Sequence, residues 1–284
     1  MSRIAFLGLG AMGRRMAVRL HGAGHDVVVY NRSGVPPGLA SPLTAAATPA
    51  VAAAGAELVI SMVSDDAASR AVWLGAEGAA EALRPGAVAI ESSTLTPSWV
   101  TTLGMKIRET GAEFLDAPVL GSLPQAEAGA LIYLIGGPAE VSERVRPVLS
   151  ALGGTLHQLG ETPAGATAKL LVNTLFATQV AVIGELLAVA RRTGLAAHCL
   201  AEVLATLPVT SAAAKGAAAA MVSARFEPLF PIALVRKDLG YALAMATGAG
   251  ASAPVTQCIS DQFTNASKRG LDRENITAVC KLYT

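Results

Sequence analysis

The feature that most constrains this chain is a glycine-rich segment at residues 8–13, which lies between two short apolar runs. The run at residues 3–7 predicts a buried parallel strand, and the run at residues 27–30 predicts a second one. Residues 14–24 carry apolar side chains at helical spacing. A strand, a glycine turn, a helix and a strand in this order are typical of a dinucleotide-binding unit. The segment consists of Gly8, Leu9, Gly10, Ala11, Met12 and Gly13.

Each glycine of the segment has its own physical role in such a turn. Gly8 allows the tight turn, Gly10 lets a pyrophosphate approach the backbone because it has no Cβ, and Gly13 lets helix and strand pack closely. The start of the helix then offers free N–H groups and partial positive charge to the phosphates. We therefore expect residues 8–13 to contact the cofactor. The alternative is that the glycines mark only a turn.

The residues after the second strand bear on which dinucleotide is bound. A site for NAD usually places Asp or Glu there, where the carboxylate binds the ribose hydroxyls. This chain has Asn31, Arg32 and Ser33 instead. Arg32 can stack on the adenine and bind a 2′-phosphate, and the other two side chains can hydrogen-bond that phosphate. We therefore expect NADP(H) to be preferred over NAD(H), the alternative being that Arg32 is a solvated residue of a polar turn.

The composition argues against several classes of protein. Of the 284 residues, 52% are hydrophobic and 15% are charged, which is typical of a globular chain long enough for two domains. The net charge of +1 gives no indication of binding to nucleic acid or to an acidic membrane surface. The three cysteines are isolated, and neither they nor the four histidines show metal-ligand spacing. We therefore expect a reducing compartment, the cytoplasm, and no metal site.

Neither a leader peptide nor a membrane span is expected. The strand and the glycine turn already occupy the N-terminus, which leaves no separate targeting segment. The most apolar long segment, residues 170–190, contains Asn173, Gln179 and Glu185. We therefore expect it to be a buried helix rather than a span across a bilayer.

The pattern of predicted elements changes near the middle of the chain. Strand-like and helix-like patterns alternate over residues 1–162, which predicts an α/β domain with a mostly parallel, doubly wound sheet. Long Ala- and Leu-rich helical stretches follow, which predict an all-α domain at residues 163–284. Ligands of such a sheet bind beyond the carboxyl ends of its strands. The loop residues expected there, beside the glycine turn, are Met62, Val63, Ser64, Ser93 and Thr94.

A second candidate site lies near the start of the helical domain. Gly165, Lys169 and Asn173 are four residues apart, so they share one helix face. A lysine among apolar neighbours needs a reason, because a buried unpaired ammonium is costly. Lys169 is either a side chain that extends to water or a catalytic group. We expect Gly165 to let something bulky come close, and Asn173 to orient Lys169 or to hold a substrate.

Five motifs in order resemble the β-hydroxyacid dehydrogenase family over essentially the whole chain. This family includes 3-hydroxyisobutyrate dehydrogenases, tartronate semialdehyde reductases and glyoxylate/succinic semialdehyde reductases. The resemblance implies a Rossmann domain, a helical domain that often forms homodimers or higher homo-oligomers, and hydride transfer at a cleft between them. The motifs are residues 8–13, residues 93–97, residues 116–119, Gly165 to Lys169 with Asn173, and Phe230 followed by Lys237, Asp238 and Leu239.

The resemblance also implies roles for individual residues. Lys169 would be the catalytic acid/base, and Asn173 would contact the substrate or orient Lys169. Lys237 would line the cofactor side of the cleft, and Ser93 and Thr94 would lie near the nicotinamide. Two residues stay open in this interpretation. Asp238 is either structural, paired with a basic neighbour, or functional, and Phe230 is either a wall of the substrate pocket or a core aromatic.

The substrate loop departs from the family pattern. The family usually follows Asp-Ala-Pro-Val with Ser-Gly-Gly, which holds a substrate carboxylate, whereas this chain has Leu120, Gly121 and Ser122. Gly121 and Ser122 can still offer backbone N–H groups. The apolar Leu120 would suit a more apolar carbonyl compound or an imine, as in the imine reductases, which share the architecture. Residues 124–129 resemble the glyoxylate/succinic semialdehyde reductase branch.

The leading hypothesis from the sequence is an NADPH-dependent reductase of a small carbonyl compound, such as a semialdehyde or an oxo acid, with Lys169 as acid/base. One alternative is an imine reductase with an apolar substrate pocket. Another is a dinucleotide-binding adaptor without catalysis, against which the presence of Lys169 argues. The expected small-molecule site involves neither nucleic acid nor membrane.

Overall fold

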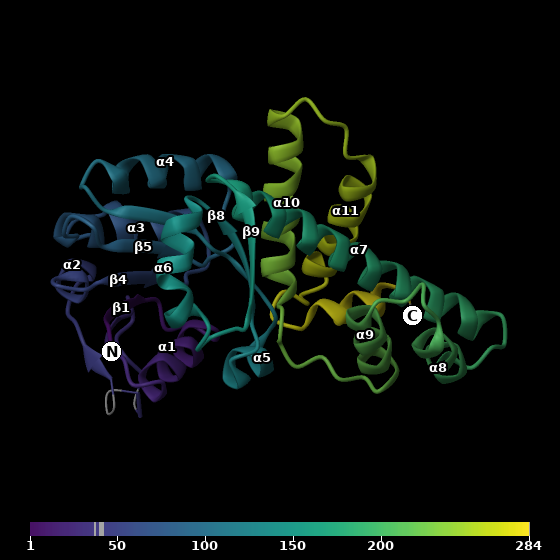
Figure 1. The fold of residues 1–284 in the computed structure, drawn as a ribbon. Coiled ribbons are helices and arrows are strands. Elements are labelled where there is room, and N and C mark those ends of the chain that lie inside the picture. Colours follow the sequence, from purple (N-terminus) through teal and green to yellow (C-terminus); the bar gives the residue numbers. More distant parts are fainter. Residues whose placement is uncertain (37, 40–42, 284) are drawn as a thin grey trace. The chain divides into compact units, whose positions relative to one another are not determined.

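The computed structural model describes residues 1–36, 38–39 and 43–283, and the chain divides into two compact units. The N-terminal unit comprises Met1–Lys169 and the C-terminal unit comprises Leu170–Thr284. Figure 1 shows the strands and helices of both units along the chain. The domain boundary expected between residues 162 and 163 stays a prediction.

A nine-stranded sheet forms the centre of the N-terminal unit within the described residues. Its strand order is β3-β2-β1-β4-β5-β6-β8-β7, with β9 paired to β8. The pairs from β3 to β6 are parallel, β8 is antiparallel to β6 and β7, and β9 is parallel to β8. The strands are β1 (Arg3–Leu7), β2 (Asp26–Tyr30), β3 (Thr44–Ala45), β4 (Leu58–Ser61), β5 (Val88–Glu91), β6 (Glu113–Asp116), β7 (Val119–Leu120), β8 (Ile132–Gly136) and β9 (Thr155–Gly160).

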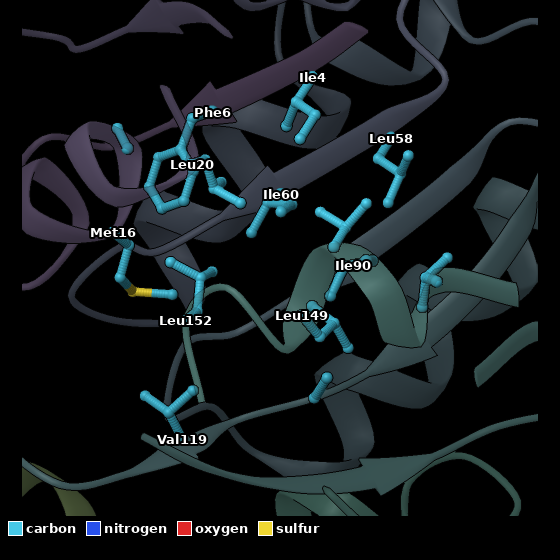
Figure 2. Packing of buried hydrophobic residues seen from close by; sticks show 14 of the residues in the cluster. Ile4, Phe6, Met16, Leu20, Leu58, Ile60, Ile90, Val119, Leu149 and Leu152 are labelled. Carbon is cyan, nitrogen blue, oxygen red and sulfur yellow. The ribbon is translucent and has the colours of Figure 1, made fainter. Parts of the chain in front are cut away.

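Alternate residues of β1, β2, β4, β5 and β6 enter different hydrophobic clusters, as the two-residue period of a strand requires. Ile4 and Phe6 of β1 join a cluster that also contains Met16 and Leu20 of α1 and Leu149 of α6 (Figure 2). Their neighbours in β1 join a second cluster, with side chains from α2, α3 and α4. The sheet is therefore covered on both faces, and the expected α/β class with a mostly parallel sheet is confirmed. The helices are α1 (Gly13–Gly22), α2 (Pro49–Ala53), α3 (Asp66–Leu74), η1 (Ala79–Ala82), α4 (Pro97–Arg108), α5 (Leu123–Ala128) and α6 (Ala139–Leu149).

The C-terminal unit is helical in its described residues, and the expected all-α domain is confirmed. Phe263 of α11, Ile232 of α10 and Val180 of α7 are fully buried in its core. An isolated bridge between Pro231 and Asn275 ties the start of α10 to the segment before η2. The elements are α7 (Ala164–Arg192), which begins in the N-terminal unit, α8 (Ala197–Thr206), α9 (Ala212–Val222), α10 (Ile232–Gly248), α11 (Pro254–Lys268) and η2 (Ile276–Leu282).

Helix α7 is 29 residues long, and within the described residues it alone has the length and composition that could cross a membrane. Its most apolar window has a mean hydropathy of 1.7, and 44% of that window is buried. A long core helix of a globular protein has the same properties, so they are weak evidence for a membrane span. The helix is only partly buried, whereas the sequence predicts a buried one.

The start of α7 is fixed to the sheet by a buried carboxylate. Oδ2 of Asp116, the last residue of β6, accepts a hydrogen bond of 2.8 Å from the Ala166 backbone N–H. A Cβ added to Gly165 would lie 2.4 Å from the Leu134 carbonyl oxygen and 2.6 Å from the Asp116 carbonyl oxygen. The bulky group that comes close to Gly165 is therefore the backbone of β6 and β8. This contact sets the first turn of the helix that carries Lys169.

The anchoring carboxylate makes a testable contribution to pH-dependent stability. Burial is the largest cause that raises the Asp116 pKa from 3.8 to about 6. The folded protein therefore binds this proton more tightly than the unfolded chain, and the resulting stability is lost as pH rises toward and past 6. In Asp116→Asn this titration is absent while an acceptor for the Ala166 N–H remains. Relative to this variant, the wild type should lose about 1 kcal/mol of unfolding free energy as the pH rises from about 5.5 to about 8. Urea denaturation measures the difference, and parallel stability curves would contradict the shift.

Candidate functional site

The glycine turn joins the end of β1 to the start of α1, and two of its glycines face other backbone. Gly8 has φ of +99°, and a Cβ there would lie 2.4 Å from the Met62 carbonyl oxygen. A Cβ on Gly13 would lie 2.0 Å from the Gly8 carbonyl oxygen. Gly10 is exposed, and a Cβ there would meet nothing within 4 Å. Gly8 and Gly13 are therefore required by the fold, whereas Gly10 leaves its backbone open to a ligand.

Asn31, directly after β2, braces this turn. Its Oδ1 accepts a hydrogen bond of 3.0 Å from the Leu9 backbone N–H. Its Nδ2 donates to Ser33 Oγ at 3.0 Å and to the Gly34 carbonyl oxygen at 2.8 Å. Sequence reasoning gave Asn31 a role toward the cofactor phosphate, and the structure gives its side chain a role in positioning the turn. Arg32 and Ser33 are exposed beside it.

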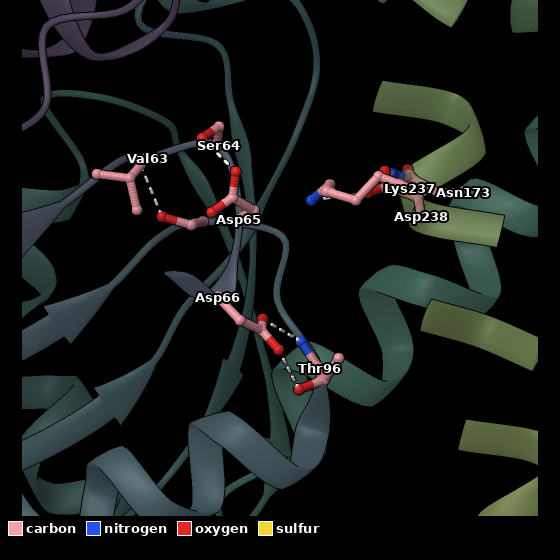
Figure 3. A network of polar contacts seen from close by, with 9 residues as sticks. Val63, Ser64, Asp65, Asp66, Thr96, Asn173, Lys237 and Asp238 are labelled. Atoms are coloured by element: carbon pink, nitrogen blue, oxygen red, sulfur yellow. Dashed lines mark hydrogen bonds and ion pairs between the residues drawn. The ribbon is translucent and has the colours of Figure 1, made fainter. Parts of the chain in front are cut away.

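The loops after β4 and β5 meet the glycine turn at the carboxyl ends of the strands. The Val63 backbone N–H donates to Ser93 Oγ at 2.8 Å, and the Val63 side chain lies beside Gly8. The Ser64 hydroxyl donates to Asp65 Oδ2 at 2.8 Å (Figure 3). The structure therefore brings the predicted loop residues together with the predicted turn. Met62, Val63 and Thr94 are half-buried, Ser93 is buried, and Ser64 is exposed.

A second polar contact holds the same two loops further along the chain. Both carboxylate oxygens of Asp66 accept hydrogen bonds from Thr96, from its backbone N–H at 2.9 Å and its hydroxyl at 2.6 Å (Figure 3). Thr96 is also the residue before α4, where its hydroxyl accepts from the Trp99 backbone N–H. The loop after β5 is thus fixed at both ends.

Ser122, in the loop after β7, is the N-cap of α5. The Ser122 hydroxyl accepts a hydrogen bond from the Gln125 backbone N–H, while the Ser122 backbone N–H donates to Gln125 Oε1 at 2.9 Å. The Ser122 N–H that sequence reasoning offered to a substrate is therefore engaged within the chain. The signal was visible, because Ser-x-x-Gln is a capping-box pattern. Leu120 is half-buried, and Gly121 is exposed with φ of +115°.

The candidate catalytic residues lie one helical turn apart on α7. Lys169 and Asn173 are each 8% exposed. The Asn173 Nδ2 donates to Asp238 Oδ2 at 2.6 Å, and Asp238 Oδ1 lies 3.0 Å from the Lys237 ammonium (Figure 3). The Lys237 ammonium also lies 4.9 Å from the ring centre of Tyr241. Asp238, whose role sequence reasoning left open, bridges Asn173 and Lys237, and no local pattern showed the Asn173 contact.

Phe230 lies directly before the bridge that leads into α10. Its backbone N–H donates to Asn275 Oδ1 at 3.0 Å, and its half-buried ring packs against the core of the C-terminal unit. These contacts give Phe230 a structural role in the C-terminal unit. Among the residues that the structure describes, no group of three or more His, Cys, Asp or Glu side chains could hold a metal ion.

Two family models match the chain in succession. The one described as the NAD binding domain of 6-phosphogluconate dehydrogenase matches residues 3–160. The one described as NAD-binding of NADP-dependent 3-hydroxyisobutyrate dehydrogenase matches residues 163–283. Both units of the structure therefore fall within matched regions.

Individual proteins match over the same length. The chain is 32% identical to the 3-hydroxyisobutyrate dehydrogenase of Pseudomonas aeruginosa. The alignment covers 100% of this chain and 99% of that protein. The chain is 31% identical to the chloroplastic glyoxylate/succinic semialdehyde reductase 2 of Arabidopsis thaliana, over 97% of this chain and 78% of that protein. The solved structure of Mycobacterium tuberculosis 3-hydroxyisobutyrate dehydrogenase with L-serine aligns with a TM-score of 0.90 at 29% identity and covers 99% of both chains.

The fold, the glycine turn and these matches define an NAD(P)-dependent oxidoreductase that acts on hydroxyl and carbonyl groups. Within that class, the chain belongs to the β-hydroxyacid dehydrogenase family, as the sequence motifs predict. The residues present fit a dinucleotide, because the exposed Gly10 backbone and the start of α1 lie at the same turn.

The different surroundings of two glycines predict different effects of the same substitution. Gly13→Ala should lower the unfolding free energy by about 3 kcal/mol, because its Cβ would collide with the Gly8 carbonyl. Gly10→Ala should leave stability near the wild-type value and weaken dinucleotide binding, because its Cβ would occupy the open space over the turn. Thermal unfolding and calorimetric titration measure the two effects. Unchanged dinucleotide affinity in Gly10→Ala would remove the pyrophosphate from this position.

Proposed function

We propose that this protein is an NADP(H)-dependent reductase of a small carbonyl compound, with Lys169 as the acid/base. The observation that carries this proposal is the burial of Lys169 on a helix whose first turn is hydrogen-bonded to the sheet. Lys169 is only 8% exposed, and burying a residue that carries an ammonium group is costly, which favours a functional role for it. A fixed donor with little access to water suits proton transfer to a developing alkoxide.

The chain's own residues divide the reaction between them. A bound nicotinamide supplies the hydride that reduces the carbonyl carbon. Lys169 gives the proton to the carbonyl oxygen, and its positive charge stabilises the negative charge that develops there. Asn173 contacts the substrate, with its amide oriented by Asp238. The backbone of residues 8–13 and the start of α1 bind the dinucleotide phosphates, and Ser93 and Thr94 lie on the nicotinamide side.

The preference for NADP(H) over NAD(H) rests on the segment after β2. Residues 31–33 contain no carboxylate that would repel a 2′-phosphate, and Arg32 is exposed beside the turn that Asn31 braces. Because Asn31 is hydrogen-bonded to the turn, the proposal assigns the 2′-phosphate mainly to Arg32 and Ser33. Lys237 is assigned to the cofactor as well.

Replacing Arg32 tests the cofactor preference. One charge-assisted contact contributes about 1.5–3 kcal/mol, so Arg32→Ala should raise the Kd for NADPH roughly ten- to hundredfold and leave the Kd for NADH almost unchanged. Arg144→Ala, at an exposed arginine of α6 that has no part in the proposed dinucleotide site, is the control for loss of a positive charge. An unchanged ratio of the two Kd values in Arg32→Ala would contradict the assignment.

The substrate proposed first is a small aldehyde or oxo compound that carries an acid group, or the corresponding hydroxy acid. The names of the matched relatives, which include a glyoxylate/succinic semialdehyde reductase and a 3-hydroxyisobutyrate dehydrogenase, support this class. A second candidate is an apolar carbonyl compound or a cyclic imine. It is favoured by the alkyl side chain of Leu120, the last residue of β7, and by the engagement of the Ser122 N–H in the capping box.

We also propose that the protein is a cytoplasmic homodimer or higher homo-oligomer. Five large apolar side chains form an exposed stripe along α7, at spacings that place them on one face of the helix. A second copy of the chain would cover this stripe. The stripe consists of Leu171, Leu175, Val182, Leu186 and Val189. The three free cysteines fit a reducing compartment.

Lys169→Met tests the acid/base assignment, because methionine keeps much of the volume of the lysine stem and removes the proton donor. Turnover should fall about 10²–10⁴-fold while the Kd for NADPH stays within about twofold. Lys268→Met, at an exposed lysine of α11, should leave both values unchanged. Full turnover in Lys169→Met would exclude Lys169 as the acid/base, and NADPH binding by a wild type without turnover on any carbonyl or imine would favour a non-catalytic adaptor.

A further inference from the structure

A buried carboxylate beneath the loops after β4 and β5 has no part in the chemistry described so far. Glu91, the last residue of β5, is 1% exposed. Its Oε1 accepts a hydrogen bond of 3.0 Å from the Ser93 backbone N–H. Its Oε2 accepts from the Ser69 hydroxyl at 2.7 Å and from the Trp73 indole N–H at 2.9 Å. Each of these three hydrogen bonds is donated to Glu91, so the surroundings are built for a carboxylate.

The contacts continue outward from Glu91 into the supporting helices. The Trp99 indole N–H on α4 donates to Ser69 Oγ at 3.0 Å. The Trp73 indole N–H on α3 also donates to Ser61 Oγ, at the end of β4, at 3.0 Å. Trp73 and Trp99 are the two tryptophans of the chain. The network therefore joins β4, β5, α3 and α4 and contains both of the protein's main fluorophores.

On its other side, the network determines the position of Ser93. Glu91 holds the Ser93 backbone N–H, and the Ser93 hydroxyl accepts the Val63 backbone N–H at 2.8 Å. These two bonds connect the buried carboxylate to both loops that were assigned to the dinucleotide. An apolar side chain at position 91 would be buried with less loss of hydration, but it could not accept the Ser93 N–H.

We propose that Glu91 is a positioning residue for the dinucleotide, which fixes the loops at residues 62–64 and 93–94 without touching the cofactor itself. This inference rests on the proposed function, since it takes these loops to bind the cofactor. Loops that are ordered before binding lose less conformational entropy when the ligand arrives, so the effect of Glu91 falls on cofactor affinity and on orientation of the nicotinamide.

The amide variant Glu91→Gln separates this role from simple space filling. The side chain keeps its size, but its NH₂ group must face a donor in either orientation, the Ser93 N–H or the Trp73 indole N–H. We expect the Kd for NADPH to rise about tenfold, from the cost of one unsatisfied buried donor, and kcat to fall. The tryptophan emission of the free protein should change as well, because the negative charge beside the Trp73 indole is removed in either orientation. The far-ultraviolet circular dichroism should be retained.

Two further variants complete the experiment. Glu113→Gln removes a carboxylate from the neighbouring strand β6, at its opposite end, and should leave NADPH affinity and tryptophan emission at wild-type values. Ser93→Ala removes the acceptor for the Val63 N–H and should also weaken NADPH binding. Because Glu91 acts through Ser93, the double variant should weaken binding by less than the product of the two single effects.

The outcomes distinguish the inference from the function on which it rests. Equal NADPH affinity in Glu91→Gln and wild type, or independent effects of the two substitutions, would overturn the positioning role and leave the proposed function standing. A wild type that binds neither NADPH nor NADH would overturn both. If Glu91→Gln fails to fold, the NADPH affinity of Ser93→Ala is the remaining test. Wild-type affinity in Ser93→Ala would show that the hydrogen bond between Val63 and Ser93 does not position the cofactor, and would overturn the positioning role.

Discussion

The hydrogen bond from the Ala166 N–H to Asp116 is the contact on which the placement of Lys169 depends. It joins the last residue of β6 to the first turn of α7, and Lys169 follows less than one turn later on the same helix. The hydrogen bond is possible because Gly165 has no side chain to keep the helix away from the backbone of β6 and β8. The cost of burying the Asp116 carboxylate appears as its raised pKa. Burial of the Asp116 carboxylate therefore lowers the stability of the folded protein, while its hydrogen bond to the Ala166 N–H fixes the start of α7.

The same end of the sheet carries a second buried carboxylate, Glu91, which lies opposite Asp116 in the strand register. The two carboxylates have different tasks. Asp116 holds the helix that carries the candidate acid/base, whereas Glu91 holds the loop at Ser93. Their positions follow from the parallel sheet, which brings the carboxyl ends of neighbouring strands to one edge. The buried carboxylates that support the proposed acid/base and the proposed cofactor loops are therefore both at this edge of the N-terminal unit.

Local sequence patterns could predict the features that depend on local geometry. The glycine turn between two apolar strands, the alternation of strands and helices and the shared face of Lys169 and Asn173 are of this kind. Strand β9 was missed, because its residues are mostly exposed and show no apolar alternation. The Asp116 and Glu91 contacts join residues that are distant in sequence, so no spacing could show them. The roles of Gly165 and Asn31 toward the backbone were hidden for the same reason.

We propose that this edge of the sheet and α7 together serve reduction of a small carbonyl compound. The most direct test is NADPH oxidation by the purified protein with glyoxylate, succinic semialdehyde, tartronate semialdehyde, an apolar aldehyde and a cyclic imine, with NADH in parallel. We expect turnover to be fastest for the aldehyde acids with NADPH. Turnover of the apolar aldehyde or the imine alone would show that Leu120 determines the substrate and would contradict the acid-bearing class. Absence of turnover with every compound and both cofactors would contradict the reductase function itself.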